Sequence, residues 1–184
     1  MAKITLVLIT ILAAILNSET ATSETAGSVQ LRIIRTTGTT TPAADVYVNT
    51  NADRKVNYFV YATSTTAWSQ AYAGIIWNLR KNKSARLSLG AGLETGSWRT
   101  GAHLFITHRG VTLLSIAEAG RKSWTHRTVL TAQVTKVFGL GLAHIRGMGT
   151  GPMLQVNIGS LQLWGTPLWE GGERSVMTGL RVNL

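Results

Sequence analysis

The fold is decided by residues 84–108, which read SARLSLGAGLETGSWRTGAHLFITH. From Ala85 to Glu94, alanine and leucine alternate with glycine, serine and isolated charges. A similar alternation resumes after Gly96 and Ser97. A period of two residues predicts β-strands that each have one apolar and one polar face. We therefore expect two antiparallel strands joined by a tight turn.

The polar face of this hairpin is unusual in its composition. The solvent face of a soluble sheet would carry many lysines and glutamates, whereas this face is built largely from Ser88, Gly90, Gly92 and a few charges. Small residues with isolated charges are typical of the cramped interior of a closed barrel whose apolar side meets lipid.

The same alternation continues along most of the chain. It predicts an all-β fold, an antiparallel up-and-down transmembrane β-barrel of about ten strands, with a range of about 8–12. Most of the expected strands have the length that a tilted strand needs to cross a bilayer. Closure of the sheet would leave no unpaired edge in lipid. The strands are expected at 46–49, 56–62, 68–79, 85–94, 98–108, 111–119, 124–137, 140–148 and 153–164, with a last strand that ends at residue 184.

The region before residue 45 differs in composition. An apolar run from Ile4 to Leu16 follows Lys3, which predicts a secretory signal peptide over residues 1–23, with an uncleaved inner-membrane anchor as the alternative. Residues 20–42 are rich in threonine, serine, alanine and glycine, which predicts that 24–44 is a flexible periplasmic segment, in which 29–34 is a lone strand or a helical plug. Residues 45–184 form the barrel. The chain is expected in the cell envelope, at the outer membrane.

Two further patterns favour a membrane barrel. Tryptophans lie near the expected strand ends, which predicts aromatic girdles formed by Trp68, Trp77, Trp98, Trp124 and Trp164. Alternation over 175–184 resembles the terminal strand of small bacterial outer-membrane β-barrel proteins, although Leu184 stands where that family usually has an aromatic residue. The resemblance is architectural and covers residues 45–184. It implies recognition of the last strand by the barrel-assembly machinery.

Hairpin register brings scattered charges together. With turns at 96–97, 109–110 and 120–123, the polar parity predicts a luminal network near one mouth, formed by Glu94, Arg99, Glu118 and Arg127. If both termini are periplasmic, that mouth is expected to be periplasmic. Arg86 and Arg181 are predicted as additional basic residues of the lumen.

This network has two interpretations. It either satisfies charged groups inside a narrow barrel or forms a gate, an anion-selective constriction. The expected role is therefore structural or a narrow, porin-like pathway for solutes, because about ten strands leave an interior mostly filled by side chains. The net charge of +10 is spread along an exported chain. It favours membrane lipids with anionic headgroups and small anionic solutes as partners of a monomer, rather than nucleic acid.

Other classes of function fit less well. A secreted soluble β-barrel that binds an apolar ligand would need the apolar parity to face inward. A barrel-embedded lipid-modifying hydrolase would need a catalytic set such as Ser123, His126 and Glu118, but His126 lies on the parity opposite Glu118. We therefore expect no enzyme. The chain has no cysteine, and its four histidines lack metal-ligand spacing, so neither a metal nor a cofactor is predicted.

Overall fold

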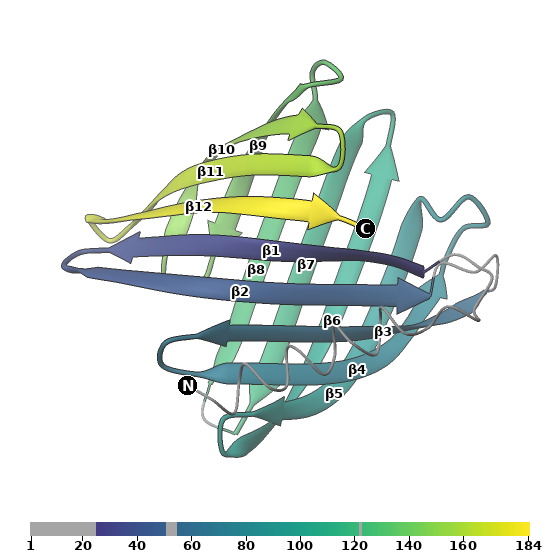
Figure 1. The fold of residues 1–184 in the computed structure, drawn as a ribbon, viewed down its shortest axis with the longest axis horizontal. Helices are drawn as coiled ribbons and strands as arrows, with labels where there is room; N and C mark the ends of the chain where they lie inside the picture. The colour runs from purple at the N-terminus through teal and green to yellow at the C-terminus, as the bar shows by residue number, and fades with distance from the viewer. Residues whose placement is uncertain (1–24, 51–54, 122) are drawn as a thin grey trace.

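The computed structural model describes residues 25–50, 55–121 and 123–184, and these form a closed antiparallel barrel (Figure 1). Each strand pairs with its neighbours in sequence, and β1 pairs with β12 to close the sheet. No helix in these three segments is long and apolar enough to cross a membrane. The predicted signal peptide, residues 1–23, lies outside the described residues. The strands are β1 (Thr25–Thr36), β2 (Thr39–Thr50), β3 (Val56–Thr65), β4 (Ser69–Asn78), β5 (Ala85–Glu94), β6 (Ser97–His108), β7 (Val111–Gly120), β8 (Trp124–Gln133), β9 (Phe138–Ile145), β10 (Gly149–Ile158), β11 (Leu161–Glu170) and β12 (Glu173–Asn183).

The two faces of the sheet are oriented as a membrane barrel requires. In β5 and β6 the polar parity points into the lumen, where Arg99 is 3% and His103 is 9% exposed. The apolar parity points outward, and Leu93 is 71% exposed. The soluble-barrel hypothesis required the opposite orientation, so the structure argues against it.

The outer wall is apolar and has aromatic side chains near both ends. We call the end that carries the β1–β2, β5–β6 and β9–β10 turns the hairpin rim, and the end where β1 begins and β12 ends the terminal rim (Figure 1). Trp68, Trp98, Trp124 and Trp169 lie by strand position at the hairpin rim, whereas Tyr58, Trp77 and Phe138 lie near the terminal rim. Between them, large apolar side chains of the outward parity are exposed, among them Leu31, Ile33, Val60, Leu89, Leu130, Leu140, Leu142, Leu154, Leu163 and Val176.

The strand count of twelve reaches the upper end of the predicted range because two parts of the sequence were misassigned. The segment 24–44 was predicted to be flexible, but residues 25–36 form β1 and residues 39–44 form the first half of β2. Its threonines favour strands, and β1 finds partners on both sides in β2 and β12. The single strand expected at 153–164 is wrong, because these residues form the end of β10 and the start of β11, joined by a turn in which Gly159 has φ of 60°.

The additional first strand reverses the expected direction of β2 to β10 relative to the chain termini, and the missed turn between β10 and β11 restores it for β11 and β12. Glu94 and Arg99 adjoin the β5–β6 turn, which lies at the hairpin rim. The expectation that this mouth shares a side with the termini is therefore wrong.

Aromatic side chains fill one half of the lumen. Phe59, Tyr72 and Ile76 form a buried cluster on β3 and β4, and the rings of Phe59 and Tyr72 meet edge to face at 5.9 Å. The luminal glycines of β5 make this packing possible. A Cβ at Gly90 would lie 2.9 Å from Phe59 Cζ, and one at Gly92 would collide with Tyr72. The glycines of the deciding stretch therefore admit aromatic rings against the inner wall.

Candidate functional site: luminal charges and cavity

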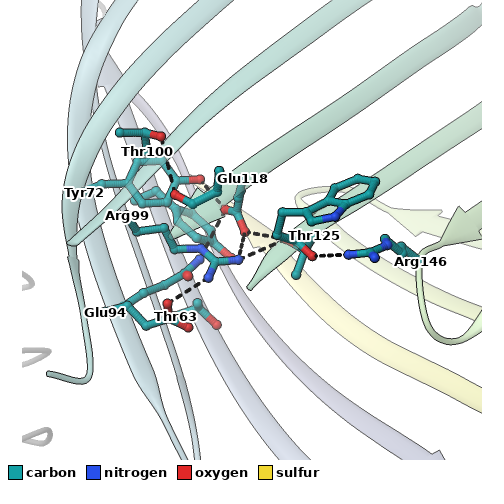
Figure 2. Close-up of polar contacts among 12 residues, drawn as sticks. Thr63, Tyr72, Glu94, Arg99, Thr100, Glu118, Thr125 and Arg146 are labelled. Carbon is teal, nitrogen blue, oxygen red and sulfur yellow. Dashed lines mark hydrogen bonds and ion pairs between the residues drawn. The ribbon is translucent and has the colours of Figure 1, made fainter. Parts of the chain in front are cut away.

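Arg99 is the centre of a buried charge cluster near the hairpin rim. Its Nη1 donates to Glu94 Oε2 at 2.8 Å, and its Nη2 lies 3.3 Å from Glu118 Oε2 and 3.0 Å from Thr125 Oγ1 (Figure 2). We call Glu94, Arg99 and Glu118 the Arg99 cluster. Because the guanidinium is almost fully buried, its charge depends on these two carboxylates.

Glu118 is held by neutral donors as well as by Arg99. Tyr72 Oη donates to Glu118 Oε1 at 2.7 Å, and Gln70 Nε2 donates to the same oxygen at 3.2 Å. The Tyr72 hydroxyl also lies 2.8 Å from His103 Nε2. Figure 2 shows Glu118 between Tyr72, Arg99 and Thr125. Both carboxylate oxygens are therefore satisfied, as a buried charge requires.

Three of the four residues predicted for the luminal network are in direct contact. Arg127 is the exception: no carboxylate of the described residues lies within ion-pair distance of it, and it lines the cavity described below. The predicted registers placed Glu118 opposite Gly101 and Arg127 opposite Ile116, as observed. The β5–β6 register is shifted by two residues, so Glu94 faces Ser97 and reaches Arg99 diagonally.

A second charge pair was not predicted. Arg32 on β1 binds Asp45 on β2 through Nε and Nη2, each at 2.6 Å. Tyr61 Oη donates to Asp45 Oδ1 at 3.1 Å. The pair was missed because residues 24–44 were assigned to a flexible segment. The alternation of Gln30 and Arg32 with apolar neighbours was the signal that could have identified it.

The other half of the lumen contains a cavity of about 240 Å³. Its wall is formed by β1 and β6–β12, and its charged members are Arg127 and Arg181, with no carboxylate. Arg181 donates from Nε and Nη2 to Gln30 Oε1 at 2.9 and 2.7 Å, and from Nη1 to Gln162 Oε1 at 3.3 Å. In the part of the chain that the structure describes, neither arginine has an ion-pair partner. Two cationic side chains thus face open volume.

Side-chain amides extend the polar wall beyond Arg181. Gln162 Nε2 donates to Asn157 Oδ1 at 2.9 Å, while Asn157 Nδ2 and Gln155 Nε2 donate to Gln133 Oε1 at 3.2 and 3.3 Å. This row runs across β11, β10 and β8 on the luminal parity. The cavity is therefore bordered by arginines and by neutral donors and acceptors.

The remaining predicted residues are placed as follows. Arg86 faces the lumen, with its guanidinium 4.4 Å from the centre of the Phe105 ring. Trp164 was predicted in an aromatic girdle at a strand end, but β11 extends beyond it to Glu170. Its side chain has luminal parity and lines the cavity. The hypothetical catalytic set does not assemble, since His126 faces outward and binds Ser115 at 3.2 Å, whereas Glu118 faces the lumen. Within the described segments, no group of three or more side chains could hold a metal ion.

Comparison with known proteins identifies the fold. No family model and no curated protein sequence matches the chain. KdgM porin, solved alone and in complex with disordered oligogalacturonate, superimposes with a TM-score of 0.58 at 10% identity. The alignment covers 84% of this chain and 98% of that chain. A mutant of the Rh. blastica porin aligns with a TM-score of 0.38 at 6% identity over 88% of this chain and 99% of that chain. The predicted resemblance to bacterial outer-membrane β-barrels is confirmed at the level of the fold.

Proposed function

We propose that this protein is an outer-membrane β-barrel that provides a narrow pathway for small anionic solutes. The observation that carries the proposal is the luminal cavity, whose charged wall residues are Arg127 and Arg181. A cationic wall without a paired carboxylate favours anions over cations in a pore.

The outer wall supports the membrane part of the proposal. A continuous apolar surface with aromatic residues near both rims suits a bilayer and would be a liability in water. All five carboxylates of the described strands, Asp45, Glu94, Glu118, Glu170 and Glu173, lie on the luminal parity. Export by the signal peptide and assembly through the last strand are parts of the same proposal.

The chemistry of the two arginines supports the choice of solute. A guanidinium binds carboxylate or phosphate groups through two parallel hydrogen bonds. The oxygens of Gln30 and Gln162 orient Arg181 without cancelling its charge, so the charge remains available to a solute. KdgM porin has been solved with oligogalacturonate, which makes sugar carboxylates a suitable first class of solute to test.

The Arg99 cluster is assigned a different role. Its one guanidinium is paired with two carboxylates and is only 3% exposed, so the cluster offers no binding capacity to a passing anion. We assign it to filling and bracing the lumen near the hairpin rim. A structural barrel without conduction is the second candidate function, favoured by the aromatic filling around Phe59 and Tyr72.

Ion selectivity in planar bilayers tests the pathway. We expect a KCl gradient to give a reversal potential that reports preference for chloride. The double variant Arg127→Gln/Arg181→Gln should move the permeability ratio toward one. The double variant Arg35→Gln/Arg174→Gln is the matched control, because it removes the same two charges from the outer wall at the hairpin rim. Cation preference, or no conductance at all, would contradict the anion pathway.

The membrane location has its own test. The mature protein should fractionate with outer membranes and migrate differently in gels with and without heating. A protein that stays soluble without detergent after removal of residues 1–23 would contradict it.

A further inference from the structure

We propose that the outer wall at β7–β9 carries a binding site for one phospholipid with an anionic headgroup, in which Arg146 and the histidines hold the phosphate and a groove beside Trp124 holds an acyl chain. The inference rests on the proposed membrane location and adds a site that is separate from the lumen.

Arg146 and Trp124 form the fixed part of the headgroup site. The Arg146 guanidinium lies 3.7 Å from the centre of the Trp124 ring, and Arg146 Nη1 donates to the Trp124 carbonyl at 2.8 Å (Figure 2). These contacts hold the guanidinium against the wall, and no carboxylate of the described residues pairs with it. A stacked, oriented guanidinium without an anion suits a phosphate at the membrane interface.

Two histidines extend this basic patch on the outward parity. The His126 and His144 rings are 6.0 Å apart. His126 Nε2 lies 3.1 Å from Thr128 Oγ1, and His144 Nδ1 lies 2.9 Å from Thr150 Oγ1. The Arg146 amide also donates to the His126 carbonyl at 2.9 Å, so the three basic residues are neighbours. These imidazoles and hydroxyls are polar groups on a wall that is otherwise apolar, and a lipid phosphate and glycerol backbone offer them further hydrogen-bond partners.

The acyl chain has a place on the other side of Trp124. A groove of about 590 Å³ adjoins Trp124, and most of its lining residues have outward parity and small side chains, while Gly90, Gly101 and Glu118 belong to the luminal parity. The outward-facing residues are Leu89, Thr100, Ala102, Ala117, Ala119 and Trp124. The register pairs Ala117 with His126 and Ala119 with Trp124, so the groove adjoins the basic patch. Free phosphate would bind at the basic patch alone, whereas a lipid would occupy the basic patch and the groove together.

Charge complementarity favours an anionic over a zwitterionic lipid. Every carboxylate of the described strands has luminal parity, whereas Arg146, His126 and His144 lie on the outward parity. The outer wall at β7–β9 therefore carries a cation with no acidic side chain of the described strands beside it. A zwitterionic headgroup would gain less there, since its own ammonium group would face Arg146.

Lipid retention measured by native mass spectrometry tests the site. The detergent-solubilised barrel is titrated with phosphatidylglycerol or phosphatidylcholine of matched chains, and we expect one phosphatidylglycerol to be retained preferentially. Arg146→Gln should weaken that retention about tenfold, since it removes a charge-assisted bond to phosphate. Ala117→Leu fills the groove and should weaken retention of phosphatidylglycerol while leaving the basic patch intact. Arg35→Gln, the same charge change elsewhere on the hairpin rim, should retain the lipid as the unmodified chain does.

Equal retention of the two lipids would overturn the site, as would unchanged retention in both Arg146→Gln and Ala117→Leu. An effect of Arg146→Gln alone would indicate a phosphate site without a lipid groove and would also overturn the proposal. Heat-modifiable migration checks that each variant is folded. A chain that does not insert into vesicles would contradict the membrane proposal as well, whereas insertion without lipid preference contradicts this inference alone.

Discussion

Replacing Arg99 with methionine tests whether the Arg99 cluster braces the barrel. The side chain is 3% exposed and makes ion pairs of 2.8 Å to Glu94 and 3.3 Å to Glu118, whose side chains are 21% and 12% exposed. Removing one partner of a buried pair leaves uncompensated charge and costs about 3–5 kcal/mol. Glu118 keeps its bonds from Tyr72, Gln70 and Thr125, so we expect the lower end, about 3 kcal/mol in the free energy of unfolding.

The assay is reversible urea unfolding in lipid vesicles, followed by tryptophan fluorescence. A second variant, Glu118→Gln, and the double variant complete a thermodynamic cycle. In the double variant both members of the Arg99–Glu118 pair are neutral. Its loss in the free energy of unfolding should therefore be smaller than the sum of the two single losses, by about 1–3 kcal/mol. Arg35→Met removes an exposed arginine from the outer wall and should change stability by less than about 0.5 kcal/mol. A loss below about 0.5 kcal/mol in Arg99→Met would refute the bracing role.

Two further substitutions test the packing and the orientation of the wall. Gly74→Val should abolish folding, seen as loss of heat-modifiable migration, because its Cβ would collide with the Leu89 carbonyl and lie 2.6 Å from Phe59 Cε1. Gly165→Ala, where the nearest atom is 3.6 Å away, should fold normally, and a folded Gly74→Val would contradict the close-packed lumen. Leu142→Arg, at an outward position that is 54% exposed, should destabilise the vesicle-inserted barrel by about 2–4 kcal/mol if it lies at the bilayer midplane. If Leu142 faced water, the substitution would change the free energy of unfolding by less than about 0.5 kcal/mol, and that result would argue against a lipid-facing wall.

Much of the fold was predictable from the sequence because a strand period of two leaves a direct signature. The alternation in β5–β8 predicted which side chains face the lumen. The registers of β6–β7 and β7–β8 followed from the turn residues, whereas that of β5–β6 did not. β1 was left open as a lone strand or a helical plug at 29–34, because its pattern competes with a run of threonines that resembles a linker. β10 and β11 were predicted as one strand, because Gly159–Ser160 is a weaker turn signal than the Gly and Pro residues that follow.

The cavity was less predictable than the charge cluster. Hairpin neighbours such as Glu118 and Arg99 can be paired by counting residues from a turn. Gln30 and Arg181 meet only when β1 closes against β12, across 151 residues of sequence. Closure depends on the total strand number, which an error in one strand changes. Arg127 was therefore assigned to the nearest predicted acids, although its side chain lines the cavity on the other half of the lumen.

The asymmetry of the lumen follows from the same stretch that decides the fold. Gly90 and Gly92 let Phe59 and Tyr72 lie against the inner wall, so the aromatic rings fill the half near β3–β5. On the opposite side, the cavity is bordered by arginines and amides, whose polar groups need water or a solute as partners. Packing one half with rings thus confines any pathway to the cationic half. The glycines of β5 accordingly narrow the lumen, and Arg127 and Arg181 set the charge of the space that remains.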